Sequence, residues 1–220
     1  IASVDCTGHG TPGALISIIG SKLLDKIVKE NGNTNPAEIL ELMNLDIIST
    51  LQTEWSVASD GMDMSLIAID VWQRKVTFAG AKNSLLLMRD GKIQRIKGDR
   101  GSIGDTHLYE KGFTNHEIKL RSDDCLYMFT DGIIDQFGGP NNKKLMNRRL
   151  LSILDSNKDY SMKLQSECLA SELESWKGSN EQVDDILVIG MRVDFDHINI
   201  VKRFRDSKHY DPGQLWSKAS

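Results

Sequence analysis

The chain has 220 residues, of which 40% are hydrophobic and 26% are charged, and its formal net charge at pH 7 is −4. These values are typical of a soluble globular protein with one large domain, and they exclude a disordered or collagen-like chain. The acidic balance argues against nucleic acid as a partner, and no apolar run approaches the roughly 18 residues that a membrane-spanning helix needs.

Two helices are predicted near the start of the chain. A short strand over 1–4 leads into a glycine-rich turn over 5–13, after which apolar residues recur at helical spacing. Asn35, Pro36 and Glu38 form a capping box that predicts the start of the second helix. The residues predicted to form the buried faces of these helices are Leu15, Ile16, Ile19, Leu23 and Ile27, followed by Leu40, Met43, Ile47 and Leu51.

A two-residue periodicity replaces the helical pattern from Asp63 onward. It predicts strands over 64–69, 75–78 and 84–88, and the Asp90-Gly91 turn joins the last of them to a strand over 92–96 in an antiparallel meander. The segments 126–129 and 186–189 are apolar on both faces, as expected of central strands covered by helices on one side and by a second sheet on the other. Helical patterns over 143–154 and 161–176 complete an α+β fold built in layers. The basic residues Lys143, Lys144, Arg148 and Arg149 are predicted to form a solvated helix face.

Aspartate is twice as common as glutamate, with 21 Asp against 10 Glu, and several aspartates stand at the ends of the predicted strands. Asp5 follows the first strand, Asp131 follows the strand that ends at Thr130, and Asp184 and Asp185 precede the last strand. If that strand is antiparallel to the other two, the carboxylates converge at one edge of a sheet. Clustered carboxylates need a cation, and oxygen ligands select Mg²⁺ or Mn²⁺. The alternative is that each aspartate only forms a turn.

The turn at Gly8, His9 and Gly10 leads into a helix, and its backbone N–H groups favour phosphate as a ligand. A tight turn without a ligand is the alternative. The chain has no P-loop, and none of its three cysteines has the arginine that a thiol phosphatase needs. The cysteines, Cys6, Cys125 and Cys168, are odd in number and far apart, which indicates a reducing compartment and a cytoplasmic location.

Residues 1–193 resemble the metal-dependent protein serine/threonine phosphatases of type 2C, in their bacterial SpoIIE-like branch. Each block of the resemblance is weak by itself, but together, in the family's order, they are specific. The blocks are Asp5-Cys6-Thr7-Gly8-His9-Gly10, the two middle segments 60–63 and 79–83, the glycine loop 99–104, Thr130-Asp131-Gly132, and Asp184-Asp185.

The resemblance implies an αββα sandwich of two mainly antiparallel sheets between helix pairs, and a site for two Mg²⁺ or Mn²⁺ ions. By the family's pattern, Asp5 bridges the two ions, the backbone carbonyl of Cys6 binds one of them, and Asp131 and Asp184 hold the other, with Asp185 either as a further ligand or as a residue that supports the ligands. Water between the ions attacks the phosphorus. His9 is the candidate general acid, and the glycines Gly8, Gly10 and Gly104 are candidates for binding phosphate or substrate.

The family also has an acidic Gly-Asp-Phe-Tyr block before the position of Asp5, and this chain begins too late to contain it. We therefore expect an N-terminally incomplete domain over 1–193, an extension of unknown role over 194–220, and an upstream sensor domain in the full-length protein, which an upstream segment could anchor to a membrane. The intact protein is then expected to have the missing strands and full activity, whereas the isolated fragment is expected to hold at most a crippled site. The expected substrate is a phosphorylated regulatory protein such as a STAS-type anti-sigma antagonist. The alternatives are a pseudophosphatase that binds a phosphoprotein without turnover, and a structural domain.

Overall fold

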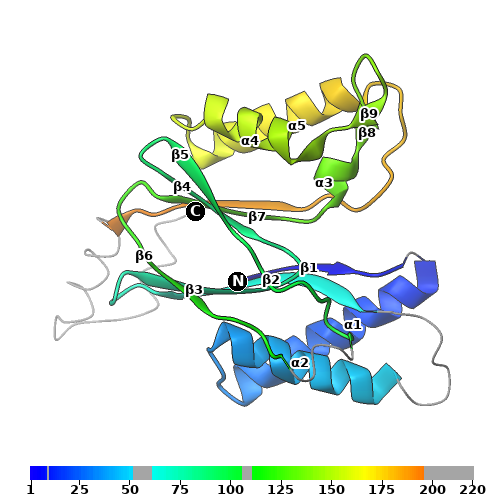
Figure 1. Cartoon of the computed structure of the whole chain (residues 1–220), viewed down its shortest axis with the longest axis vertical. Coiled ribbons are helices and arrows are strands. Elements are labelled where there is room, and N and C mark those ends of the chain that lie inside the picture. Colours follow the sequence, from blue (N-terminus) through cyan, green and yellow to red (C-terminus); the bar gives the residue numbers. More distant parts are fainter. Residues whose placement is uncertain (9, 52–60, 106–110, 196–220) are drawn as a thin grey trace, which may run out of the picture.

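The computed structural model describes residues 1–8, 10–51, 61–105 and 111–195. They form four layers, with two β-sheets face to face and helices on both outer sides (Figure 1). One helical layer contains α1 (Gly10–Asp25), which continues as the π-helical turn η1 (Lys26–Glu30), and α2 (Pro36–Leu51). The other contains α4 (Met146–Ser156) and α5 (Met162–Lys177). The predicted αββα sandwich is therefore confirmed.

Both sheets are antiparallel. The first has the order β1 (Ala2–Cys6), β2 (Met62–Asp70), β3 (Lys75–Ala81) and β6 (His116–Lys119). The second has the order β10 (Val188–Arg192), β7 (Cys125–Phe129), β4 (Leu85–Arg89) and β5 (Lys92–Ile96). After β7 come the short helix α3 (Gly132–Asp135) and a small hairpin of β8 (Phe137–Gly138) and β9 (Lys143–Lys144).

Three local predictions need correction. The predicted meander is divided, because the chain passes from the first sheet to the second between β3 and β4. The last strand begins at Val188, two residues later than expected, and among the described strands it lies at the edge of its sheet rather than in the centre. Lys143 and Lys144 belong to the β8–β9 hairpin, so they do not share a helix face with Arg148 and Arg149.

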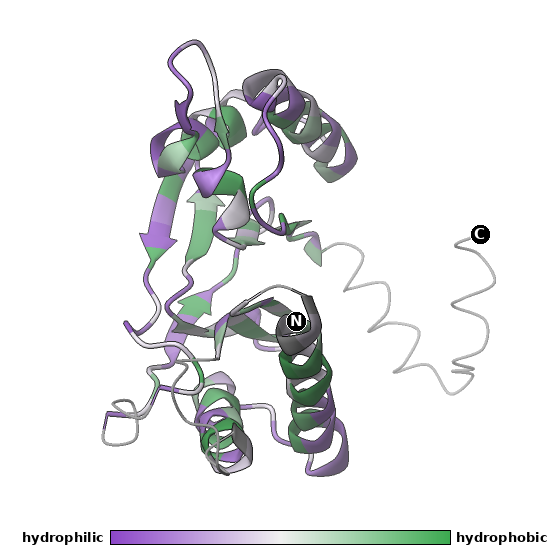
Figure 2. Ribbon diagram, turned by 90° about the vertical axis from the view of Figure 1, so that its right-hand side faces the viewer, coloured by the Kyte–Doolittle hydropathy of each residue, from purple (hydrophilic) through white to green (hydrophobic). Residues whose placement is uncertain are grey.

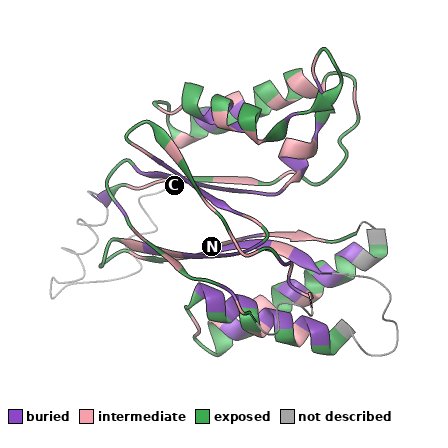
Figure 3. Ribbon diagram, in the orientation of Figure 1, coloured by how far each residue is buried: buried purple, intermediate pink, exposed green. Residues whose placement is uncertain are grey.

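The core consists of three apolar clusters, one at each interface between layers (Figure 3). Side chains alternate across each strand, so Met62, Met64 and Leu66 of β2 pack with the helices α1 and α2, while Ile67 packs between the sheets. Phe78 also lies between the sheets and is fully buried. The ribbon coloured by hydropathy shows α1 as largely hydrophobic and the loops between elements as mostly hydrophilic (Figure 2).

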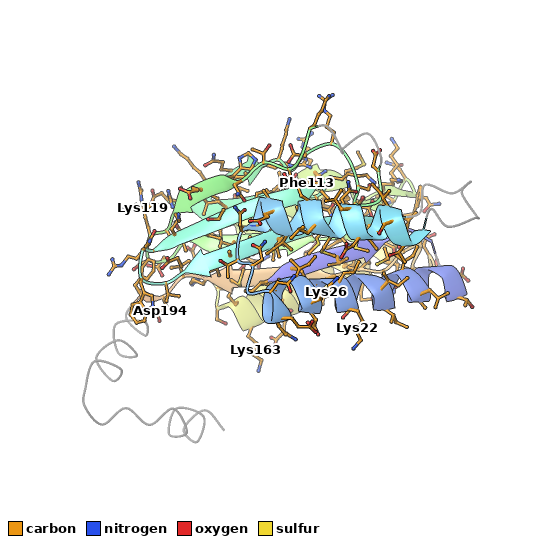
Figure 4. The ribbon with its side chains drawn as sticks, turned by 90° about the horizontal axis from the view of Figure 1, so that it is seen from below. Lys22, Lys26, Phe113, Lys119, Lys163 and Asp194 are labelled. Atoms are coloured by element: carbon orange, nitrogen blue, oxygen red, sulfur yellow. The ribbon has the colours of Figure 1, made fainter. Side chains whose placement is uncertain are left out.

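The two N-terminal helices lie side by side beneath the first sheet, with Lys22 on the exposed side of α1 (Figure 4). The N-cap half of the predicted capping box is confirmed, since the Asn35 side chain accepts a hydrogen bond from the Glu38 backbone N–H at 3.4 Å, whereas the Asn35 N–H donates to the Asn33 side chain at 2.9 Å instead of to Glu38. The predicted face of α1 is wrong at Leu15, whose side chain is exposed. None of the helices in the described part of the chain is long and apolar enough to cross a membrane.

Candidate active site

Asp5 lies near the end of β1, on the face of the first sheet that meets the second sheet. Its partner in the antiparallel register is Asp63 of β2. Ser65 and Ile67 follow Asp63 at two-residue intervals, and Ile67 packs between the sheets, so Asp63 and Asp5 face the same way. The strand pairing therefore places two carboxylates side by side at the rim of the sandwich.

Asp131 comes from the other sheet, two residues after the end of β7. A close approach of two backbones brings the loop before β10 to it, since a Cβ atom on Gly132 would lie only 2.4 Å from the carbonyl oxygen of Asp185. Thr130 fixes the same loop, because its hydroxyl donates to that carbonyl at 3.0 Å and accepts from the Leu187 N–H at 2.9 Å. Asp184 lies in this loop, and its carboxylate accepts from the Asp185 N–H at 2.7 Å.

The electrostatics show that these acids are close together. The pKa of Asp5 is raised to about 7, first by burial, then by the negative charges of Asp131 and Asp184, then by a hydrogen bond with Asp131 and the charge of Asp63. Ionising both of two carboxyl groups that share a hydrogen bond is unfavourable unless a cation offsets their charges. The structure thus brings Asp5, Asp131 and Asp184 together, but across two sheets rather than along the edge of one sheet as predicted.

The residue types at the rim fit a hard divalent cation. All the converging side chains carry carboxylate oxygens, which suit Mg²⁺ or Mn²⁺. A cation there would offset both the burial and the neighbouring negative charges that raise the pKa of Asp5. As they stand, however, no three His, Cys, Asp or Glu side chains of the described residues are arranged around a common point.

A cleft of about 680 Å³ lies beside Asp5. Its walls are the end of β1, the first turns of α1 and the loop before β10. Gly8 has a left-handed backbone with φ of 91°, and a Cβ on Gly13 would lie 2.5 Å from the Gly8 carbonyl oxygen, so the turn needs glycine at both positions. The lining residues are Val4, Asp5, Cys6, Gly8, Gly13, Ala14, Ser17, Thr130 and 182–187, which include Asp184 and Asp185.

Of the three remaining candidate residues, the structure describes two. His9, the candidate general acid, lies outside the described residues. Gly10 begins α1 and lies in the chain between Gly8 and Gly13, which line the cleft. The N–H of Gly104 donates to the Asn44 side chain at 2.7 Å, so this amide is engaged within the fold.

Sequence reasoning missed the surroundings of Asp63. One carboxylate oxygen of Asp63 accepts from the Ser102 hydroxyl at 2.5 Å, and the other pairs with the Lys82 ammonium at 2.5 Å. The available signal was the position of Asp63, an acid on the inward face of a strand whose other inward residues are buried. Ser102 and Lys82 are distant in sequence from Asp5, and no local pattern links them to it.

A family model, Stage II sporulation protein E (SpoIIE), matches residues 1–194. The chain belongs to the SpoIIE family. The SiaA-PP2C domain of Pseudomonas aeruginosa is 32% identical with a TM-score of 0.78, and the match covers 88% of this chain and 75% of that one. The chain is therefore a PP2C-type serine/threonine phosphatase domain, as the resemblance predicted.

Two more distant structures share the fold. The PP2C phosphatase domain of SpoIIE from Bacillus subtilis, solved with a fragment of its regulatory domain, is 20% identical with a TM-score of 0.67, and the match covers 88% of this chain and 52% of that one. The catalytic domain of the phosphatase PstP, in complex with two manganese ions, is 17% identical with a TM-score of 0.61, and the match covers 88% of this chain and 87% of that one. Comparison with curated proteins gave no match.

Proposed function

We propose that this SpoIIE-family domain hydrolyses phosphoserine or phosphothreonine on a regulatory protein of bacterial signalling. The observation that carries the proposal is the convergence of Asp5 from the first sheet with Asp131 and Asp184 from the second, at a place where burial and these neighbouring charges raise the pKa of Asp5 to about 7. Carboxyl groups whose pKa is shifted by burial and by neighbouring charges are concentrated at functional sites. A STAS-type anti-sigma antagonist is the substrate class we propose.

Carboxylate and backbone oxygens of this chain would hold the metal ions. Asp5, the carbonyl of Cys6, Asp131 and Asp184 would hold two Mg²⁺ or Mn²⁺ ions, with Asp185 as a further ligand. When bound, such ions neutralise phosphoryl charge and lower the pKa of water. Thr130 and Gly132 keep the loop of Asp184 against Asp131.

The other proposed roles concern the substrate. The turn at Gly8 and Gly10 would present its N–H groups to the phosphoryl group, and His9 would protonate the departing serine or threonine oxygen. Because Gly104 donates to Asn44, its contribution would be to hold the loop that carries Ser102.

Asp131→Asn in the full-length protein tests this function. We expect it to abolish both Mn²⁺ binding, measured by titration calorimetry, and Mn²⁺-dependent release of phosphate from a phosphoserine STAS-type protein. Asp135→Asn is the matched control, because Asp135 lies four positions later and pairs with Lys144 at 2.8 Å instead of joining the cluster. Mn²⁺ binding without turnover of any phosphoserine protein would indicate a binding module instead.

A further inference from the structure

Lys82 stands at the bend where the chain leaves the first sheet for the second, and this bend is fixed by close backbone packing. A Cβ on either Gly80 or Gly98 would lie 2.3 Å from the carbonyl oxygen of Asn83, so the segments 80–83 and 98–99 touch backbone to backbone. The Lys82 N–H donates to the Asp99 carbonyl at 2.7 Å. The position of the Lys82 Cα atom is therefore set by the fold.

The backbone of Lys82 is strained. Its φ of 63° lies in the left-handed region, which glycine and asparagine adopt most easily. A lysine in this conformation costs folding free energy that a glycine would not. Five other non-glycine residues of the described chain also have positive φ, so what distinguishes Lys82 is the set of contacts that its side chain makes.

That side chain reaches the rim of the candidate active site. Its ammonium pairs with the Asp63 carboxylate at 2.5 Å, and Asp63 is held from the other side by Ser102. The Asp63 side chain is 13% exposed, whereas the Lys82 side chain is 56% exposed, so a nearly buried anion anchors a cation that faces solvent. The pKa of Lys82 is raised by its hydrogen bond to Asp63 and, more weakly, by the charges of Asp131 and Asp5, which places the ammonium within electrostatic reach of both.

Building on the proposed function, we infer that Lys82 is a substrate-binding residue whose ammonium contacts an oxygen of the phosphoryl group next to Asp5 and Asp131. A phosphate monoester brings up to two negative charges to a rim that already carries several carboxylates. A fixed ammonium offsets that repulsion and binds phosphate as a point charge. Asp63, with both oxygens engaged, serves as the anchor of this lysine and leaves Asp5, Asp131 and Asp184 for metal ions.

A purely structural role makes a different prediction. If Lys82 only neutralised Asp63, its removal would free a carboxylate, adding or tightening a metal site without changing the affinity for phosphate. Binding of inorganic phosphate, measured by titration calorimetry in the presence of Mg²⁺, distinguishes the two roles and does not depend on turnover.

The experiment compares Lys82→Met, Lys82→Gly and Lys82→Arg in the full-length protein. We expect Met and Gly to weaken phosphate binding by about tenfold or more, and Arg to stay within about threefold of the wild type, because one charged hydrogen bond is lost in the first two variants only. Glycine adopts the left-handed backbone of position 82 without strain, so the thermal midpoint of Lys82→Gly should not fall below that of the wild type. A lower midpoint would be expected of a variant that fails to fold.

Lys75→Met is the matched control, since Lys75 pairs with Glu117 at 2.6 Å on strands away from the cluster. Its phosphate affinity should equal that of the wild type. An unchanged phosphate affinity in Lys82→Met and Lys82→Gly would overturn the inference. A wild-type protein that binds phosphate but releases none from phosphoserine proteins would refute the proposed function alone, because the phosphate titration would still decide the role of Lys82.

Discussion

Replacing Asp5 by asparagine should stabilise the metal-free protein at pH 8, although it removes the central carboxylate of the candidate site. In the wild type, burial and the neighbouring acids Asp131 and Asp184 raise the pKa of Asp5 from 3.8 to about 7. The folded state therefore holds a proton there that the unfolded chain releases near pH 4. Unfolding is favoured as the pH rises through this range, so metal-free stability should fall between about pH 4 and pH 7.

The magnitude follows from the size of the pKa change. At about 1.36 kcal/mol for each pKa unit, the ceiling is about 4 kcal/mol. Asp5 is only partly buried, and water screens its neighbours, so we expect about 1 to 2 kcal/mol at pH 8. For a domain of this size that corresponds to a thermal midpoint higher by about 3 to 6 °C in Asp5→Asn than in the wild type.

Thermal unfolding in a chelator at pH 5, 6, 7 and 8 measures this effect. The wild type should lose stability along the series, whereas Asp5→Asn should show a flatter profile, and Mn²⁺ should raise the midpoint of the wild type only. Asp155→Asn serves as a control, because Asp155 pairs with Lys158 on the surface at 3.0 Å. An Asp5→Asn protein that is less stable than the wild type at pH 8 without metal would refute the reasoning.

Two further substitutions probe the framework. Gly132→Ala should weaken Mn²⁺ binding by about tenfold or more in calorimetry, because its Cβ would lie 2.4 Å from the Asp185 carbonyl; Gly32→Asn, where nothing lies within 4 Å, should leave binding unchanged. Arg89→Met should lower the free energy of unfolding, measured in urea, by about 3 to 5 kcal/mol. The substitution removes the guanidinium that pairs with the buried carboxylate of Asp124 at 2.6 Å in the wild type. Adding Asp124→Asn to Arg89→Met should recover part of that loss, and no recovery would contradict this account.

Local sequence patterns determined most of the elements of this protein. The capping box predicted the start of α2, and Asp90-Gly91 predicted the β4–β5 hairpin, in which both turn residues have positive φ. These signals are strong because they depend on interactions between residues a few positions apart. The positions of Asp5, Asp131 and Asp184 at strand ends were visible for the same reason.

Only the tertiary structure decided which sheet each strand joins and which distant residues meet. Two-residue periodicity states which side of a strand is buried, but it carries no information about the partner strand. The division of the predicted meander between two sheets therefore had to come from the fold, and so did the meeting of Asp5 with Asp131 across the sandwich. Lys82 and Ser102 reach Asp63 from 19 and 39 positions away, contacts that chain packing creates and no local pattern encodes.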